Sequence, residues 1–281
     1  MSSNQKYYLS KVREGSDYNL IRASLLQKLI RRNMVEEALY IGELFLKDNH
    51  HKGLKRRLQI IAAEDIGLGW IESVLFLETH SDNLLLCIQA LCEAPKNREA
   101  DRFLLTIANN INSIKNRGED ILKEGKILNR LFQLSEEWFK NRKNRDSLKK
   151  LENAFSIMAK ENALNEAVIL QLGKNYIELT RANIHGARCQ MALAALIYCR
   201  NYKDLFNYIP KVDLKYKPKA FDEIFDFAID MHTPIGKKLK RDFNHWVENC
   251  TQVNPEVFYE DLYDIYGNEK YPLISLSNKK A

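Results

Sequence analysis

Clusters of lysine and arginine are the chemical feature that stands out in this sequence of 281 residues. Basic residues crowd positions 52–57, 140–150, 211–219 and 237–241, and the run at 140–150 contains a single acidic residue, Asp146. Clustered cationic side chains bind nucleic-acid phosphates without reading base sequence. The competing interpretation is an ordinary solvated surface, because the net charge is only +6. The residues that we predict to contact nucleic acid are Arg56, Arg57, Lys96, Arg98, Arg142, Lys143, Arg145, Lys149, Lys237 and Lys238.

Sites for nucleotide hydrolysis and for metal ions are not predicted. A phosphate-binding loop ends in Gly-Lys-Ser or Gly-Lys-Thr, whereas none of the Gly-Lys steps at 125–126, 173–174 and 236–237 continues in this way. His185 and Cys189 stand four residues apart, but a cysteine at helical spacing is typical of core packing, and the sequence has no HExxH motif and no paired CxxC motifs. We therefore expect no metal, no cofactor and no ATPase site in this chain.

Glu64 and Asp65 form an acidic pair within a predicted helix. Neighbouring helix positions diverge by about 100°, so the two carboxylates cannot face one substrate together. Asp65 falls on the apolar side of the helix, where we expect it to pair with a buried cation or to cap a neighbouring helix. An enzyme built around His232, His245 and either acid is an alternative, although no sequence spacing brings these groups together.

The elements that must position these side chains are predicted to be helices. Apolar residues recur at spacings of three and four almost throughout, for example over residues 25–30, and this pattern predicts an all-α fold, a multi-helix array. Short β-like runs occur only at 7–9 and 273–276. Thr233 followed by Pro234 predicts a capped helix start, because the hydroxyl can cap and proline suits the first helical position.

The best candidate for a domain boundary is the polar stretch 109–125. It would divide the chain into a helical region at 1–115 and a further helical region at 116–281. The alternative is one continuous domain. Gly67 and Gly69 are expected to end the helix that precedes them, as glycine commonly does.

Composition indicates a globular protein, with 45% hydrophobic and 28% charged residues. No apolar run approaches the about 20 residues that span a bilayer, and residues 1–11 lack the apolar stretch of a secretory signal. The five cysteines are odd in number and include no CxxC pair, which argues against a disulfide framework. We expect a soluble cytoplasmic protein that is not associated with membranes.

Three blocks of sequence carry a resemblance to a known family. RRLQIIAAEDIGLG, at 56–69, resembles the signature in the C-terminal region of the replication-associated recombination protein A family, the AAA+ ATPases also called MgsA and related to the Werner-helicase-interacting protein. VREGSD at 12–17 and ALCEAPKNREADR at 90–102 resemble flanking blocks in the same order. The resemblance covers residues 12–107. The signature positions are Glu64, Asp65, Gly67 and Pro95.

This resemblance implies a helical fold related to clamp-loader collar domains, which mediate oligomer assembly beside a DNA-acting motor. The 281 residues contain no counterpart of the ATPase module that precedes this region in the family, so we expect no catalytic residue to be carried over. Segments 25–40 and 232–246 are similar to stand-alone proteins with only this C-terminal type of domain.

Together these observations predict a non-enzymatic accessory protein of DNA replication, recombination or repair. It would form a homo-oligomer and act with a separate AAA+ ATPase or with DNA. The alternatives are the enzyme described above and a sequence-independent RNA-binding helical protein that uses residues 140–150.

Overall fold

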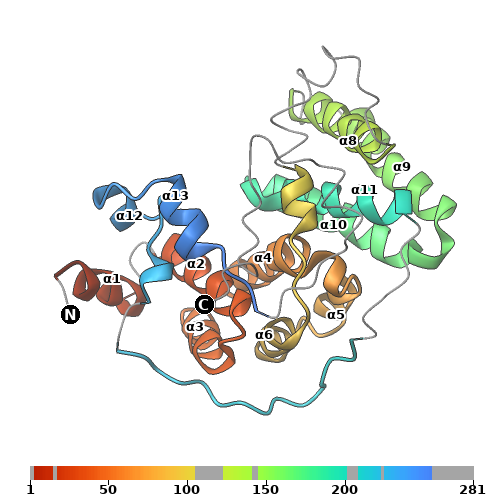
Figure 1. Cartoon of the computed structure of the whole chain (residues 1–281). Coiled ribbons are helices and arrows are strands. Elements are labelled where there is room, and N and C mark those ends of the chain that lie inside the picture. Colours follow the sequence, from red (N-terminus) through yellow and green to blue (C-terminus); the bar gives the residue numbers. More distant parts are fainter. Residues whose placement is uncertain are drawn as a thin grey trace, which may run out of the picture. The chain divides into compact units, whose positions relative to one another are not determined.

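The computed structural model describes residues 3–14, 18–104, 123–140, 145–200, 208–222 and 225–254. In these ranges 76% of the residues are helical and no strand is formed, which confirms the all-α prediction (Figure 1). No helix in the described part of the chain combines the length and apolar character needed to cross a bilayer.

The β-like run at residues 7–9 is not a strand, because it lies inside helix α1 (Ser3–Glu14). Tyr8 and Val12, which stand one helical turn apart, are both buried, and this spacing of four favours the helix. The second β-like run, at 273–276, lies outside the described residues.

The chain divides into two compact units that interleave along the sequence. Unit 1 comprises Met1–Leu58, His80–Lys96 and Tyr208–Ala281, and unit 2 comprises Gln59–Thr79 and Asn97–Asn207. This division differs from the predicted one into residues 1–115 and 116–281. The predicted boundary itself falls among residues 105–122, outside the described residues.

Unit 1 is built on α2, α3 and α6, which pack on one another. Gly42 of α3 permits the close approach of α6, because a Cβ there would lie 2.4 Å from Cδ1 of Ile88. Asn33 and Asn49 follow α2 and α3 with φ of 56° and 60°, the left-handed conformation that commonly ends a helix. The elements of unit 1 are α1, α2 (Tyr18–Arg31), α3 (Val35–Lys47), the first part of α4 (His51–Ile61), α6 (Leu84–Glu93), η5 (Asp226–Ala228), α12 (Pro234–Lys238), α13 (Phe243–His245) and η6 (Trp246–Cys250).

Residues 208–220 of unit 1 form an extended segment, which we call the strap, held against α6 and α3. The buried side chain of Gln89 donates to the carbonyl oxygen of Asp213 at 3.0 Å and accepts from the N–H of Lys215 at 2.8 Å. Further along, the N–H of Lys219 donates to the carbonyl oxygen of Glu36 at 3.0 Å. One amide side chain therefore fixes the centre of an extended segment.

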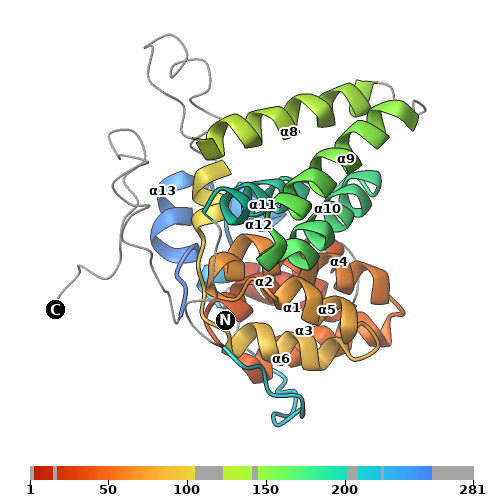
Figure 2. The ribbon, with the colours of Figure 1, turned by 90° about the vertical axis from the view of Figure 1, so that its right-hand side faces the viewer.

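Unit 2 centres on α11, whose residues are buried from Cys189 to Ile197. It packs against α8 and α10, and α9 packs on both of these, as Figure 2 shows for α8, α9 and α10. Gly173 of α10 faces Phe155 of α9, where an added Cβ would lie 2.7 Å from the ring. The elements of unit 2 are η1 (Ala62–Ile66), η2 (Gly67–Gly69), α5 (Ser73–Thr79), α8 (Lys123–Lys140), α9 (Arg145–Glu161), η3 (Ala163–Asn165), α10 (Glu166–Arg181), η4 (His185–Ala187) and α11 (Arg188–Arg200).

Candidate nucleic-acid interface

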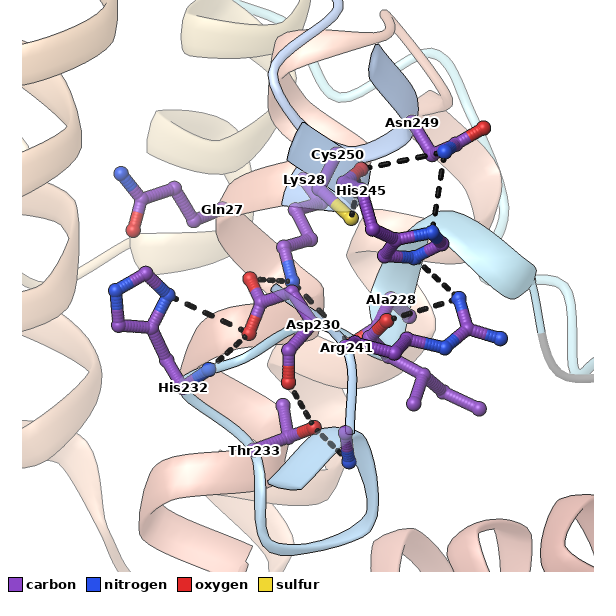
Figure 3. A network of polar contacts seen from close by, with 12 residues as sticks. Gln27, Lys28, Ala228, Asp230, His232, Thr233, Arg241, His245, Asn249 and Cys250 are labelled. Atoms are coloured by element: carbon purple, nitrogen blue, oxygen red, sulfur yellow. Dashed lines mark hydrogen bonds and ion pairs between the residues drawn. The ribbon is translucent and has the colours of Figure 1, made fainter. Parts of the chain in front are cut away.

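A buried ion pair anchors the C-terminal part of unit 1 to α2 (Figure 3). Nζ of Lys28 lies 2.5 Å from Oδ2 of Asp230, and the two side chains are 4% and 3% exposed. The same ammonium donates to the carbonyl oxygen of Ala228 at 3.2 Å, and the Tyr8 hydroxyl donates to that oxygen at the same distance. Residues from three distant parts of the sequence therefore meet at one point.

The electrostatics of this point follow from its burial. Burial alone raises the pKa of Asp230, but the hydrogen bond from His232 and the charge and hydrogen bond of Lys28 outweigh it and hold the pKa well below its usual range. Burial lowers the pKa of Lys28 against the opposing effect of Asp230. Burial, together with the nearby charge of Asp230, raises the pKa of Tyr8 far above its usual value. The phenol therefore acts as a neutral hydrogen-bond donor.

Asp230 also begins a tight turn into α12. Its carboxylate accepts from the N–H of His232 at 2.8 Å, and its carbonyl oxygen accepts from the Thr233 hydroxyl at 2.8 Å. Thr233 in turn accepts from the N–H of Gly236 at 3.0 Å, with Pro234 at the start of the helix, so the predicted cap is confirmed. A Cβ on Gly236 would lie 1.7 Å from the carbonyl oxygen of Asp230, so only glycine fits there.

Arg241 closes the turn on its far side. The N–H of Arg241 donates to the carbonyl oxygen of Gly236 at 2.9 Å, while Lys240 takes up φ of 53° and ends α12. The guanidinium binds both carboxylate oxygens of Asp226, at 2.6 and 3.0 Å, and also contacts the His245 ring. These contacts hold the pKa of Asp226 below its usual value. The result is a rigid frame for α12 and α13.

This frame presents a basic surface with an exposed aromatic ring, which we call the α1–α12 basic face. It consists of Tyr7 and Lys11 of α1 with Lys237 and Lys238 of α12, and the two helices lie side by side in Figure 1. Tyr7 is 42% exposed, and its ring centroid lies 5.4 Å from Nζ of Lys11 and 5.6 Å from Nζ of Lys238. Both ammonium groups lie over the Tyr7 ring, so the face combines an exposed aromatic side chain with clustered positive charge, the two kinds of group that contact single-stranded nucleic acids.

Sequence reasoning found the lysines of α12 but missed Tyr7 and Lys11. The spacing of four between Tyr7 and Lys11 was a usable signal, because such residues lie on one helix face. The approach of Lys238 had no signal, since it depends on how α12 docks beside α1.

Two of the predicted phosphate contacts are corrected by their burial. Lys96 is fully buried, and its ammonium donates to the carbonyl oxygen of Cys92. Arg98 is 6% exposed and pairs with Asp65 and Asp101. Both residues follow α6 in a polar stretch typical of an exposed loop, but their side chains are buried.

The remaining predicted cations differ in exposure where the structure describes them. In unit 1, Arg56 and Arg57 are half-buried on α4, and Arg57 donates to Oε1 of Gln27 at 3.0 Å. In unit 2, Arg145 and Lys149 are exposed on α9. The two other residues of that run, Arg142 and Lys143, lie outside the described residues.

The signature positions have structural roles. Asp65 is fully buried, with Oδ1 3.4 Å from Nε of Arg98, so it lies beside a buried cation as its place on the helix led us to expect. Glu64 lies 4.0 Å from the same guanidinium. Gly67 has φ of 48°, and a Cβ there would lie 2.4 Å from the carbonyl oxygen of Asn97. The helix ends here because the backbone of Asn97 closes in, its N–H donating to the carbonyl oxygens of residues 65 and 66 at 3.0 and 3.1 Å.

Pro95, the fourth signature position, is half-buried and lies just beyond the end of α6. The preceding residue, Ala94, is extended at ψ of 148°, as expected before proline. Pro95 therefore turns the chain out of α6.

The side chains of the enzymatic alternative are each engaged locally. His232 and His245 belong to unit 1, where they contact Asp230 and Arg241, whereas Glu64 and Asp65 belong to unit 2. Among the described residues no three His, Cys, Asp or Glu side chains are placed to hold a metal ion; the side chain of His185 is not among those described.

The cysteines offer no activated thiol in the parts of the chain that are described. All five are free. Burial raises the pKa of Cys92 to about 12 and that of Cys199 to about 11. A thiolate nucleophile is disfavoured at such sites, because burial stabilises the neutral thiol.

Comparisons of the chain with protein-family models, curated proteins and solved structures gave no match. The resemblance to the AAA+ family therefore remains a prediction from the three sequence blocks.

Proposed function

We propose that this chain is a non-catalytic helical protein that binds nucleic acid through its phosphates, as an accessory of DNA replication, recombination or repair. The α1–α12 basic face carries the proposal. Tyr7 is exposed with two ammonium groups over its ring, and Lys237 and Lys238 are exposed at the end of α12. Such a surface suits a polyanion with stackable bases.

The frame beneath this face supports the same proposal. The Lys28–Asp230 pair and the Arg241–Asp226 contacts fix the turn from which α12 starts. The backbone that carries Lys237 and Lys238 is therefore held in place whether or not a ligand is bound. Preorganisation of this kind lowers the entropic cost of binding. The family resemblance supplies the biological setting, namely self-assembly and action beside a separate AAA+ ATPase on DNA.

Fluorescence anisotropy with single-stranded, duplex and forked DNA and with matched RNA, each over a salt series, tests the proposal. We expect binding that weakens steeply with salt, because phosphate contacts release counterions. Replacing Lys237 and Lys238 with Ala should reduce the slope of log K against log salt by about 0.7 for each lost contact on a single strand.

The matched control removes two exposed lysines elsewhere, Lys160→Ala and Lys174→Ala, with the same change in net charge. An equal loss of slope in the control would mean that only overall charge matters. Absence of binding at low salt would refute the nucleic-acid function. Tighter binding to RNA than to DNA at equal salt would favour the RNA-binding alternative, because only RNA offers the 2′-hydroxyl.

Self-assembly is tested separately by sedimentation velocity over a concentration series. A single species with the 32.8 kDa mass of the chain at every concentration would refute the homo-oligomer.

A further inference from the structure

A cluster of aromatic side chains lies next to the α12 lysines in the chain and belongs to the same frame. The cluster consists of His232, Phe243 and Trp246. The Trp246 ring lies 5.8 Å from the His232 ring in an edge-to-face arrangement and 5.5 Å from the Phe243 ring at a tilt of 40°. Neither pair is stacked in parallel, so the rings do not cover one another as a closed stack would.

The cluster is open to solvent. Phe243 is 46% exposed and the side chain of His232 is 56% exposed. Trp246 is half-buried, whereas the other two tryptophans, Trp70 and Trp138, are 2% and 4% exposed. Binding of a ligand over exposed aromatic rings is favourable, because it removes their apolar surface from water.

The cluster brackets the lysines of the turn. His232 precedes α12, and Phe243 stands three residues after Lys240, so the Cα atoms of Lys240 and Phe243 are at most about 11 Å apart. Lys237, Lys238 and Lys240 are exposed. Three ammonium groups therefore lie between aromatic rings along one short segment of the chain.

The backbone under the cluster is also fixed. The carboxylate of Asp242 accepts from the N–H of His245 at 2.9 Å and caps α13, which carries Phe243. Asn249 lies 3.1 Å from the His245 ring, and its carbonyl oxygen accepts from Arg32, the residue that follows α2, at 2.8 Å. The backbone that carries Phe243 and Trp246 is therefore ordered before a ligand binds.

We propose that His232, Phe243 and Trp246 form a base-stacking site for single-stranded nucleic acid, with Lys237, Lys238 and Lys240 on its backbone phosphates. This inference rests on the proposed function and adds strand selectivity to it. Bases in a duplex have their faces covered by neighbouring bases, whereas an unpaired base can stack on an aromatic ring. The site accordingly prefers single strands.

Trp246 provides a direct readout, because it is half-buried whereas Trp70 and Trp138 are buried. The protein is titrated with oligo(dT) and with a duplex of the same length, and tryptophan fluorescence and anisotropy of labelled DNA are recorded together. We expect oligo(dT) to quench the fluorescence of Trp246. Trp246→Phe should abolish the quenching while much of the binding remains.

Phe243→Ala tests selectivity. Loss of one stacked base should weaken oligo(dT) binding by about 5- to 100-fold, leave duplex binding nearly unchanged and so bring the two affinities together. The matched control is Phe139→Ala on α8, which removes a ring of similar exposure, 44% against 46%, from unit 2. Circular dichroism and thermal melting of both variants establish that they fold.

The outcomes separate this inference from the proposed function. Binding of duplex and single strand alike, with no quenching or with equal losses in Phe243→Ala and Phe139→Ala, overturns the stacking site and leaves phosphate binding in place. Absence of binding to either form overturns both.

Discussion

The Lys28–Asp230 pair allows the sharpest test of how unit 1 is held together. Asp230→Asn keeps the shape of the side chain and an acceptor for the His232 N–H but removes the charge, so the Lys28 ammonium is left buried without its counterion. Removal of one member of a buried ion pair costs about 3–5 kcal/mol. Solvent screens this pair little, because the side chains are 4% and 3% exposed.

Urea denaturation followed by circular dichroism and tryptophan fluorescence measures this cost. With a denaturant slope of about 1–3 kcal/mol/M, the urea midpoint of unit 1 should fall by roughly 1 M or more. Lys28→Met should be similarly destabilising, and the double variant should be less destabilised than the sum of the two single variants, because no buried charge is left alone.

An exposed pair in the same unit serves as the control. Arg13 and Asp222 lie 2.7 Å apart, with side chains 43% and 87% exposed. Asp222→Asn should therefore cost less than about 1 kcal/mol. A cost for Asp230→Asn no larger than that for Asp222→Asn would contradict a stabilising buried pair, as would single effects at Lys28 and Asp230 that simply add.

The same pair predicts a pH dependence. The pKa of Asp230 is lower in the folded than in the unfolded chain, so its contribution to stability is fully present above the unfolded value of about 3.9 and is lost as pH falls toward the folded pKa. Between these limits the free energy of unfolding should fall by about 1.4 kcal/mol per pH unit from this group alone. In Asp230→Asn the free energy of unfolding should lack this part of its fall at acid pH. An identical fall in both proteins would show that Asp230 does not cause it.

Three further perturbations have defined outcomes. Gly67→Ala should destabilise unit 2 by about 1–3 kcal/mol in urea melts, because of the positive φ and the Asn97 carbonyl oxygen 2.4 Å from the new Cβ, whereas Gly53→Ala, where nothing lies within 4 Å, should not. Arg98→Met should cost about 3–5 kcal/mol by leaving the buried Asp65 carboxylate without its cation; a neutral effect would mean that the carboxylate is stabilised by other groups. Gln89→Ala should release the strap, so that trypsin cleaves after Lys215 faster while the thermal midpoint changes little, and an unchanged cleavage rate would show that Gln89 is not its anchor.

The all-α fold could be read from the sequence because helical spacing is local. Residues three and four apart share a face whatever the rest of the chain does, so the stripe at residues 25–30 predicted a buried helix face. The Thr233–Pro234 helix start and the buried position of Asp65 were predictable for the same reason, since each depends on residues within a few positions.

Solvent exposure of the cations was decided by the tertiary structure. Lys96 and Lys238 both stand in polar stretches, yet Lys96 is fully buried and Lys238 is exposed beside Tyr7. Composition reports charge but not the direction in which a loop folds. A list of phosphate contacts based on charge alone therefore mixed buried and exposed groups.

The candidate site itself was also decided by the tertiary structure. Lys28 and Tyr8 meet the carbonyl oxygen of Ala228 across 200 and 220 residues of sequence. No spacing rule reaches that far, because such contacts depend on which helix faces pack together and on the path of the chain between them. The sequence by itself determined the helices and their caps; packing determined which of their side chains form the buried frame and which ones it presents to a ligand.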